Sequence, residues 1–350
     1  MAAVEIPVGR LGPDQCLTQG TWVKLICGAS NQDLTAIADL CALFGAAGVS
    51  CVDVGADPAV VRAARQGLDW LVDHGFPRPW LMVSISDGAD AHFRKAWFDS
   101  SRCPVDCSRP CERICPADAI ARHSAIDAER CYGCGRCLPA CPHGLISERE
   151  HRLDSAAIPE LLAELRPDAV EVHTAPGRSD AFDAVVTALA SSRVRLQRLA
   201  VSCGLEGHAL THHALSAELW LRFNSLRRHG FRPLWQLDGR PMSGDVGAGT
   251  ARSAVQLWRQ LRPEAPPGPL QLAGGTNAHT IELLNASEVP AGVAFGGMAR
   301  RLVMPLLQEA EAHGTALRHW PDGWRRGLAL AETLVQPWRD RNRSSTLHSC

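Results

Sequence analysis

The sequence lacks a charge excess, a long apolar run and a recognisable secretion signal. Its 36 lysines and arginines balance 37 aspartates and glutamates. This argues against a nucleic-acid-binding protein, because such proteins usually carry a basic excess. No apolar run reaches the roughly 18 residues that a membrane-spanning helix needs. The opening MAAVEIPVGRLGPDQ has no charged segment followed by an apolar core, so we expect no signal peptide and a cytoplasmic location.

Cysteine, in contrast, is abundant, with 14 copies in 350 residues. A disulfide framework is improbable without a secretion signal, because cytosolic thiols are kept reduced. Most cysteines fall between Cys103 and Cys141, and the scattered ones are expected to be mainly small core residues. Cys350, in a polar C-terminal tail that we expect to be disordered, is predicted to be a free thiol without a role. The other scattered cysteines are Cys16, Cys27, Cys41, Cys51 and Cys203.

The second cysteine run, CYGCGRCLPACP, has the spacing Cys131-x2-Cys134-x2-Cys137-x3-Cys141, followed by Pro142. This is the ligand spacing of bacterial ferredoxins. Three closely spaced thiolates bind one iron–sulfur cluster there, and the fourth binds a neighbouring cluster. Such a run therefore requires a second set of cysteines elsewhere in the chain.

The first cysteine run supplies that second set, with spacing Cys-x3-Cys-x3-Cys-x3-Cys and again a proline after the last cysteine. The x3 spacing departs from the usual x2, so we expect cluster A to be either a [4Fe–4S] or a [3Fe–4S] cluster that is lost more easily. Zinc fits poorly, because zinc sites favour Cys-x2-Cys pairs a dozen or more residues apart. The expected ligands are Cys103, Cys107, Cys111 and Cys141 for cluster A, and Cys115, Cys131, Cys134 and Cys137 for cluster B.

Glycines and arginines accompany these cysteines. Gly133 and Gly135 suit a tight loop whose backbone N–H groups approach the cluster sulfides. Nearby positive charge favours the reduced cluster and should raise its potential. Each arginine taken singly fits an ordinary surface position equally well. The arginines are Arg102, Arg109, Arg113, Arg122, Arg130 and Arg136.

The rest of the chain repeats a pattern in which a short apolar, β-branched run is followed by an amphipathic helical stretch. This alternation implies a parallel sheet. Eight such units in about 290 residues suit a (β/α)8 barrel, which typically takes around 250 residues. A doubly wound open sheet is the alternative. The expected strands are 22–30, 49–57, 79–86, 169–175, 198–204, 233–239, 269–275 and 292–298.

The cysteine segment falls between the third strand and the helix that follows it, on the barrel face where active sites are built. We therefore expect a TIM-like barrel interrupted by a bacterial-type two-cluster ferredoxin module. The expected parts are an N-terminal extension (1–20), a first barrel part (21–98), the insert (99–148), a second barrel part (149–335) and a disordered tail (336–350).

Two glycine pairs end the last two expected strands. Many barrels hold a phosphate with the loops at these two positions, so a flavin or another phosphate-bearing ligand is one interpretation. The other interpretation is that the glycines only make tight turns. The candidate residues are Gly274, Gly275, Thr276, Asn277, Gly296 and Gly297.

Other polar groups also end strands. Cys27 and Cys203 are candidate redox or nucleophilic thiols, although buried packing is the commoner role. His173 is a candidate base or ligand, although a histidine hydrogen-bonded to a neighbouring loop is the commoner outcome. Asp238 is a further catalytic candidate. Asp57 precedes a proline at a helix start, where capping competes with catalysis. Ser30 and Ser86 complete this set, and the pair His212-His213 is expected to lie on the surface without a third metal ligand.

The stretch WVKLICGASNQDL at 22–34, followed by VDVGADP at 52–58 and the two cysteine runs, resembles the LdpA family. These are light-dependent period proteins of the cyanobacterial circadian clock. The resemblance covers nearly the whole chain. It implies an iron–sulfur redox sensor that links photosynthetic electron transport, through the quinone pool, to the clock period. It also implies a clock-input protein complex and a quinone as partners, and a location that extends to the periphery of photosynthetic membranes.

Three function classes follow from these observations. A sensor, in which cluster oxidation or loss changes a surface that a partner reads, is the first. The alternative is an iron–sulfur oxidoreductase that passes electrons to a flavin, a quinone or a phosphate-bearing ligand at the barrel mouth. A plain electron carrier ranks last, because it needs no barrel. We therefore expect a sensor rather than an enzyme.

Overall fold

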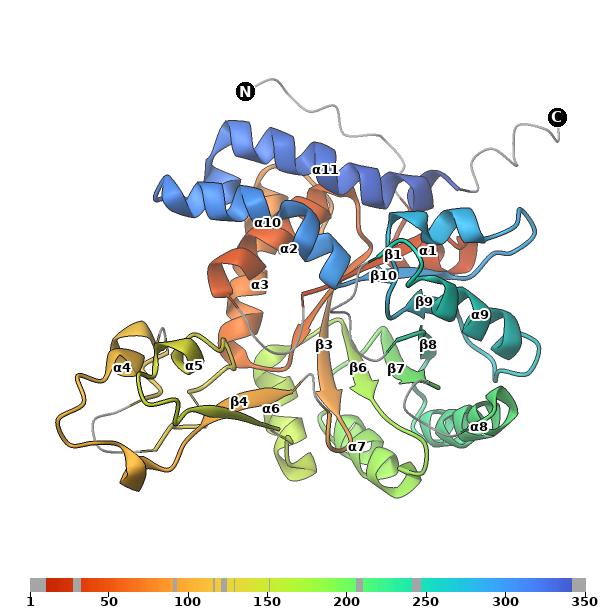
Figure 1. Ribbon diagram of the computed structural model, residues 1–350. Coiled ribbons are helices and arrows are strands. Elements are labelled where there is room, and N and C mark those ends of the chain that lie inside the picture. Colours follow the sequence, from red (N-terminus) through yellow and green to blue (C-terminus); the bar gives the residue numbers. More distant parts are fainter. Residues whose placement is uncertain are drawn as a thin grey trace.

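The computed structural model describes residues 11–27, 33–90, 93–115, 117–120, 125–128, 130–150, 152–205, 210–240 and 247–341. Eight parallel strands form a closed barrel in the order β1-β10-β9-β8-β7-β6-β3-β2 (Figure 1). Closure between β1 and β10 rules out the doubly wound open sheet. The barrel strands are β1 (Trp22–Ile26), β2 (Cys51–Gly55), β3 (Trp80–Ser86), β6 (Ala169–His173), β7 (Arg198–Gly204), β8 (Pro233–Asp238), β9 (Leu270–Ala273) and β10 (Gly292–Phe295).

Each of these strands lies within a range expected from the sequence, and helices surround the barrel as the alternating pattern predicts. The α-helices of the barrel are α1 (Pro13–Gln19), α2 (Leu34–Ala47), α3 (Pro58–Asp73), α6 (Ile158–Leu165), α7 (Ser179–Ser191), α8 (His212–Arg228), α9 (Arg252–Leu261), α10 (Gly297–Ala312) and α11 (Pro321–Asp340). Short 3-10 helices are η2 (Ser155–Ala157), η3 (Ala278–Leu283) and η4 (Leu317–His319).

Helix α3 shows how local sequence sets these elements. Asp57 is its N-cap, and its carboxylate accepts hydrogen bonds from the backbone N–H groups of Ala59 and Val60. Pro58 follows at a position where its missing N–H costs nothing. The apolar face of α3, which includes Val60, Val61 and Leu68, is buried, whereas Val72 near the C-terminal end is 46% exposed.

The N-terminal end of the barrel is closed by a small apolar plug. Helix α1 contributes Cys16 and Leu17, which pack against side chains from six strands. Such a layer fills the inside of an eight-stranded barrel, as expected for a packed core rather than a pore. The strand residues of the plug are Trp22, Cys51, Met82, Ala169, Ala200 and Leu234.

The C-terminal helix extends further than the sequence suggested. Helix α11 continues to Asp340, and Trp338 within it is 1% exposed. The expected tail boundary at residue 336 is therefore wrong, because an apolar face carries the helix on against α2 and α10. Ser30 and Cys350, both named above, lie outside the described residues.

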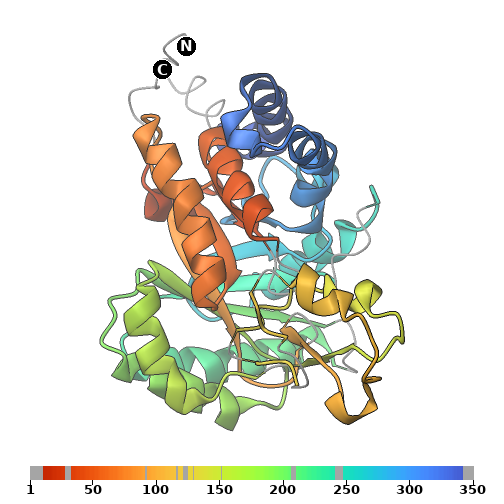
Figure 2. The ribbon, with the colours of Figure 1, turned by 90° about the vertical axis from the view of Figure 1, so that its left-hand side faces the viewer.

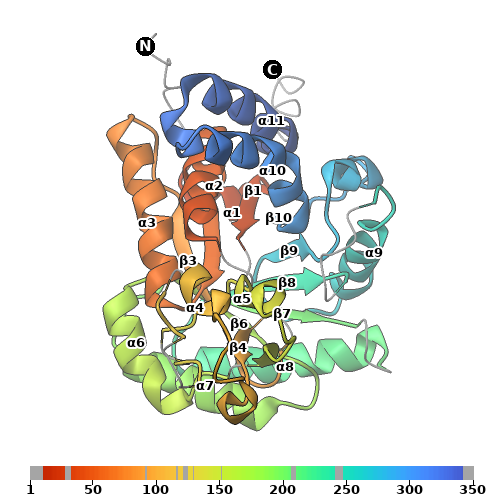
Figure 3. The same ribbon diagram turned by 60° about the vertical axis from the view of Figure 1, so that its left-hand side comes forward.

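The cysteine segment leaves the barrel after β3 and returns before α6. Its two ends pair as an antiparallel ribbon of β4 (Arg94–Trp97) and β5 (Ser147–Glu150), with Arg94 opposite Glu150. Between them lie η1 (Ser100–Arg102), α4 (Pro110–Ile114) and α5 (Cys137–Ala140). Figures 1 and 2 show this yellow and orange segment protruding from the barrel, and in Figure 3 the α4–α5 region lies in front of β3 and β6.

Candidate iron–sulfur site and barrel interior

The four cysteines expected for cluster B line one cavity in the protruding segment. Three of them, Cys131, Cys134 and Cys137, come from the second run, and Cys115 comes from the end of the first. Apolar side chains, including Ile120 and Ile126, form the rest of the wall. Cys115 thus meets three cysteines that lie 16 or more positions later in the chain. A cluster that takes one ligand from the first run and three from the second requires this arrangement.

Three of the four cysteines expected for cluster A meet at a small apolar core of the same segment. Cys111 belongs to a small core with Phe98, Cys137, Ile120 and Ile146, and Cys103 and Cys141 pack against that core. Cys107 is half-buried, and its Sγ accepts a hydrogen bond from the backbone N–H of Arg109 at 3.4 Å.

The two cysteine runs have the same local geometry. In each, a short helix, α4 or α5, ends at a cysteine that precedes a proline in the sequence. The backbone of Cys115 has φ −75° and ψ 110°, and that of Cys141 has φ −76° and ψ 111°. Both sulfurs accept a backbone N–H from four residues further on, at 3.3 Å from Ala119 and 3.4 Å from Leu145. This is an internal structural repeat, matching the repeat in the sequence.

These thiols suit metal ligands better than free nucleophiles. Burial raises the pKa of Cys111 and of Cys134, and it raises that of Cys137 to about 12. Burial also acts on Cys141, but backbone N–H groups, led by that of Leu145, outweigh it and lower the pKa. A protonated thiol is a poor nucleophile, whereas a metal ion removes the proton and N–H···S bonds then tune the site. The donor set therefore fits an iron–sulfur cluster.

Residues with positive φ bend the backbone within both cysteine runs. Gly133 and Gly135 have φ of 80° and 73°, values that favour glycine. A Cβ on Gly133 would lie 2.3 Å from the carbonyl oxygen of Arg94, so the loop passes directly against β4. The first run achieves a similar bend at Arg109, with φ 50°, and an ion pair to Glu112 at 2.7 Å.

The segment is fixed to the barrel at the second cysteine run. Tyr132 is 6% exposed and belongs to the main core, and Cys134 packs against that core. Arg136 pairs with Asp33 at 2.8 Å, and Asp33 is the N-cap of α2. The loop that carries the cluster B cysteines is therefore in direct contact with the helix that follows β1.

A second attachment holds the chain where it leaves β3. His173, at the end of β6, pairs through Nδ1 with Asp90 at 3.0 Å, and its ring packs edge-on against Phe93. The backbone N–H of Asp87 donates to the carbonyl of His173 at 3.1 Å. The Asp87 carboxylate accepts hydrogen bonds from Thr174 and Arg178. His173 therefore positions the base of the cysteine segment.

Below His173, the barrel interior contains a connected polar network. The Lys24 ammonium donates to Asp53 at 2.8 Å and to Glu171, and all three side chains are at most 1% exposed. Gln236 donates to Glu171 at 2.8 Å, and His173 Nε2 lies 3.1 Å from the same carboxylate. The network continues toward the N-terminal end of β1 through two further hydrogen bonds of 2.6 Å. Gln271 donates to Gln236, and the Trp22 indole donates to Gln271.

The charges of this network are set by mutual pairing. Burial alone would lower the pKa of Lys24, but Asp53 and Glu171 outweigh it and raise the pKa above its ordinary value. Burial raises the pKa of Asp53, whereas Lys24 and His173 outweigh burial at Glu171 and hold its pKa at about 2. Lys24 is thus a cation, and it lacks the free amine that covalent catalysis by lysine needs.

His173 is also a cation. Burial would lower its pKa, but hydrogen bonds and charges from Asp90 and Glu171 raise it to about 10. Both ring nitrogens face carboxylates, which leaves no lone pair for a base or a metal ligand. Of the roles considered for this histidine, the geometry therefore favours hydrogen bonding to a neighbouring loop over a base or a metal ligand.

Sequence reasoning missed the interior network, although a signal was present. Each of five barrel strands carries one polar residue between apolar neighbours, as in WVKLI and AVEVH. In parallel strands that are buried on both faces, such a residue must point into the barrel and needs a partner there. The residues are Lys24, Asp53, Glu171, Gln236 and Gln271.

The remaining strand-end candidates are occupied by internal contacts. Cys27 and Cys41 are buried with their sulfurs 3.9 Å apart, and Cys203 is 5% exposed with its pKa raised by burial. Asp238 accepts hydrogen bonds from Ser202 and Gln236. The Ser86 hydroxyl donates to the carbonyl of Gly88 at 2.8 Å.

The glycine loops behave in two ways. Gly274 and Gly275 have φ of 67° and 83°, and a Cβ on either would lie within 2.9 Å of a backbone oxygen. Thr276 donates to the carbonyl of Ala294, and the Asn277 amide caps η3 and donates to the carbonyl of Gly247 at 2.9 Å. This loop is filled by its own contacts. Gly296 and Gly297 instead begin α10, where no side chain caps the helix.

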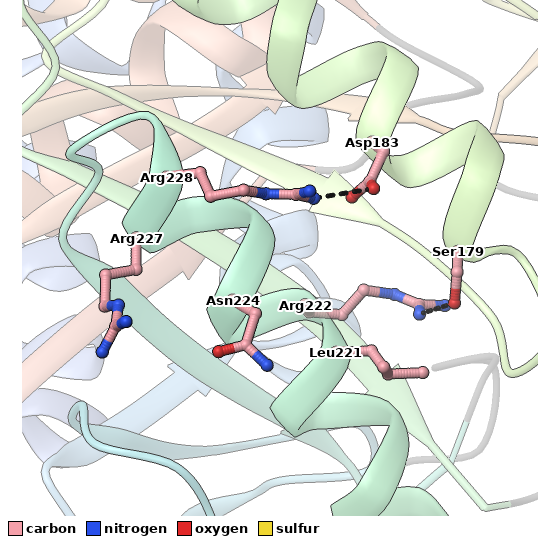
Figure 4. Close-up of a pocket in the computed structure, with 7 residues that line it drawn as sticks. All are labelled: Ser179, Asp183, Leu221, Arg222, Asn224, Arg227 and Arg228. Atoms are coloured by element: carbon pink, nitrogen blue, oxygen red, sulfur yellow. Dashed lines mark hydrogen bonds and ion pairs between the residues drawn. The ribbon is translucent and has the colours of Figure 1, made fainter.

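A separate pocket of about 290 Å³ lies outside the barrel between α7 and α8 (Figure 4). Its deepest side chain, Arg222, is 2% exposed and donates to Ser179 at 2.9 Å and to the carbonyl of Ala175 at 3.0 Å. Arg222 also donates to Thr174, whose hydroxyl donates to Asp87. A continuous chain of hydrogen bonds therefore joins this pocket to the base of the cysteine segment.

Comparisons with known proteins agree with this division of the chain. Residues 103–152 match a family model described as the LdpA Fe-S cluster-binding domain, and residues 161–337 match the Light dependent period A C-terminal domain. The curated protein "Light dependent period A" of Synechococcus elongatus is 44% identical over 337 residues, covering 93% of each chain.

The cysteine segment alone has further relatives. The putative electron transport protein YsaA of Escherichia coli is 35% identical over 65 residues, 18% of this chain and 41% of that protein. An uncharacterised ferredoxin of Methanocaldococcus jannaschii is 46% identical over 50 residues, 12% of this chain and 33% of that protein. Across the part of the chain that the structure describes, no helix combines the length and apolar character needed to cross a bilayer.

Fold and site together define an iron–sulfur protein built on a (β/α)8 barrel with a ferredoxin-like segment after its third strand. With 44% identity over nearly its whole length, the chain belongs to the light dependent period A family.

Proposed function

We propose that this protein is a redox sensor. Two iron–sulfur clusters in the protruding segment would report the redox state of the cell to the circadian clock input and so adjust its period in response to light. The observation that carries the proposal is the interlocking of the two cysteine runs, with Cys115 among the cysteines of the second run and Cys141 beside those of the first.

The proposed ligands follow the crossed pattern. Cluster A, of the [4Fe–4S] or [3Fe–4S] type, takes Cys103, Cys107, Cys111 and Cys141, and cluster B, of the [4Fe–4S] type, takes Cys115, Cys131, Cys134 and Cys137. Each cluster supplies a one-electron redox centre. The chain supplies N–H···S hydrogen bonds at Cys107, Cys115 and Cys141, which stabilise added negative charge.

A sensor also needs a route from the clusters to a surface that a partner reads. The Arg136–Asp33 ion pair and the His173–Asp90 pair attach the segment to two sides of the barrel mouth. From Asp87 the hydrogen bonds continue through Thr174 to Arg222 in the α7–α8 pocket. We place the contact with a clock-input protein partner at this pocket, and we propose a quinone as the oxidant and a cytoplasmic location reaching the photosynthetic membrane surface.

The test is a redox titration of anaerobically purified protein followed by electron paramagnetic resonance. We expect two signals and about eight sulfides per chain, with about eight irons if cluster A is [4Fe–4S] or about seven if it is [3Fe–4S]. At least one should change state at potentials spanned by the cellular quinone pool. Zinc in place of iron, or clusters that keep one oxidation state throughout that range, would rule the sensor out.

The alternative proposal is an iron–sulfur oxidoreductase whose clusters feed a flavin, a quinone or another phosphate-bearing ligand at the barrel mouth. The uncapped start of α10 at Gly296 and Gly297 favours it, because free N–H groups at a helix N-terminus bind phosphate. A flavin that co-purifies in stoichiometric amount, visible after acid release, would select this alternative. Its absence, together with reversible cluster titration, would select the sensor.

A further inference from the structure

Two histidines and a glutamate form a cluster on the outside of the barrel, away from the cysteine segment. His212 and His213 are the first two residues of α8, and Glu264 follows α9. The Glu264 carboxylate spans both rings, with Oε2 2.8 Å from His213 Nδ1 and Oε1 3.8 Å from His212 Nε2. The three ligand atoms all lie within 4.8 Å of one another. The expectation that no third ligand would join these histidines is therefore wrong.

The glutamate is held in place by α8 itself. Its carbonyl oxygen accepts two hydrogen bonds of 2.9 Å, from the Ser216 hydroxyl and from the Trp220 indole N–H. Its backbone N–H donates to the carbonyl of Leu261 at 2.9 Å, at the end of α9. Side chains of α8 thus fix the backbone that carries the third ligand beside the two histidines.

We propose that His212, His213 and Glu264 bind one zinc-like divalent transition-metal ion. Two imidazole nitrogens and one carboxylate oxygen are the donors that zinc accepts at about 2.0–2.2 Å, and two such donors in a tetrahedral set lie about 3.3 Å apart. The structure has His213 Nδ1 2.8 Å from Oε2 and His212 Nε2 3.8 Å from Oε1, and one ligand atom from each of the three residues lies within 4.8 Å of the other two. Calcium and magnesium prefer all-oxygen sites and are excluded by the two histidines.

The site would connect two helices that the sequence separates. His213 is a highly exposed ligand, with 70% of its side chain accessible, so the fourth coordination position opens to solvent. A bound ion would tie the start of α8 to the chain that leads from α9 to β9. This inference rests on residues of the barrel wall and is independent of the cluster assignment.

The chain contains a matched control. His279 and Glu282 form a similar surface pair, with Nδ1 and Oε2 3.0 Å apart. Among the residues that the structure describes, no third histidine, cysteine or carboxylate completes a metal-binding group with this pair. His279→Ala therefore removes a histidine–carboxylate contact of the same kind without touching the proposed site.

The experiment adds zinc to protein that retains its iron–sulfur clusters and measures binding by calorimetry and zinc-edge X-ray absorption. We expect one zinc per chain with nitrogen and oxygen neighbours at about 2.0–2.2 Å. His213→Ala and Glu264→Gln should each weaken binding at least tenfold, whereas His279→Ala should leave it unchanged. Near-ultraviolet circular dichroism of each variant checks that the barrel is folded.

Two results would overturn the assignment. Zinc–sulfur distances of about 2.3 Å would place the ion on cysteines instead. Equal zinc affinity of folded His213→Ala and wild-type protein would show that the three side chains form only an ion pair. Iron and sulfide content is measured in the same samples. A result that contradicts the sensor proposal can therefore be told apart from a result that contradicts the zinc site.

Discussion

The barrel and the protruding segment differ in the interactions that stabilise their cores. The barrel buries an extended set of apolar side chains around a paired polar network. The segment has a core of five buried residues, two of which are cysteines, Cys111 and Cys137. Small domains with so little apolar burial usually need a metal to fold. The comparison indicates that the barrel folds on its own side chains, whereas we expect the segment to depend on its iron–sulfur cofactor.

Replacing a cysteine proposed as a cluster ligand should have the largest effect on structure, and this effect should be confined to the cysteine segment. Cys134→Ser is expected to abolish cluster B, reduce iron by about half and unfold the segment, because metal binding and folding are coupled there. Iron and sulfide analysis and limited proteolysis measure this. The barrel should remain resistant to protease. Full iron content in the variant would disprove the ligand assignment.

Removing the buried ammonium should be the largest single change within the barrel. Lys24→Met leaves Asp53 buried without its counter-ion and leaves Glu171 with His173 alone, and breaking such a pair typically costs about 3–5 kcal/mol. Urea unfolding followed by far-ultraviolet circular dichroism measures the loss. Iron content per folded chain should stay at the wild-type value.

The matched control for Lys24→Met exchanges the whole group. Lys24→Met, Asp53→Leu and Glu171→Met together remove all three charges, and such apolar replacement of a buried ionic group is often neutral or stabilising. A triple variant as unstable as Lys24→Met would mean that the network contributes more than charge pairing.

The attachment at His173 should make stability depend on pH. Its pKa is raised from 6.5 to about 10 in the folded protein, so its contribution is complete below pH 6.5 and is lost as pH rises toward 10. The groups that face it are Asp90, Glu171 and the Phe93 ring. His173→Gln should flatten the decline in the free energy of unfolding between pH 6.5 and 10. An unchanged slope would show that other groups dominate in this window.

The exposed link between segment and barrel should matter least for stability. Arg136 and Asp33 are 42% and 40% exposed, and pairs of this kind contribute about 0–1 kcal/mol. Arg136→Ala should therefore change the unfolding midpoint little, while loosening the cluster B loop as measured by hydrogen exchange of Cys134 and Gly135 amides. Arg325→Ala, which breaks a more exposed pair with Asp322, is the control. Equal exchange in the two variants would exclude a role for Arg136 in attachment.

Much of this architecture was predictable because its signals are local. The eight strands follow from apolar runs and the α3 start from Asp57 and Pro58, while the ligands proposed for the clusters follow from cysteine spacing. The end of α11 was misjudged because a polar sequence after residue 336 hides the buried Trp338. The sequence left the role of His173 open, because both of its carboxylate partners come from distant positions that only the fold brings together.

The sequence by itself determined that the chain alternates strands and helices around a parallel sheet and carries cysteines spaced for iron–sulfur clusters, since hydrophobic periodicity and ligand spacing act over a few neighbouring residues. Only the tertiary structure decided which distant residues meet. Lys24 and Glu171 are 147 positions apart, and His213 and Glu264 are 51 apart. Barrel closure and helix packing bring these residues together, and buried or neighbouring charges then pair because isolation from water makes an unpaired charge costly.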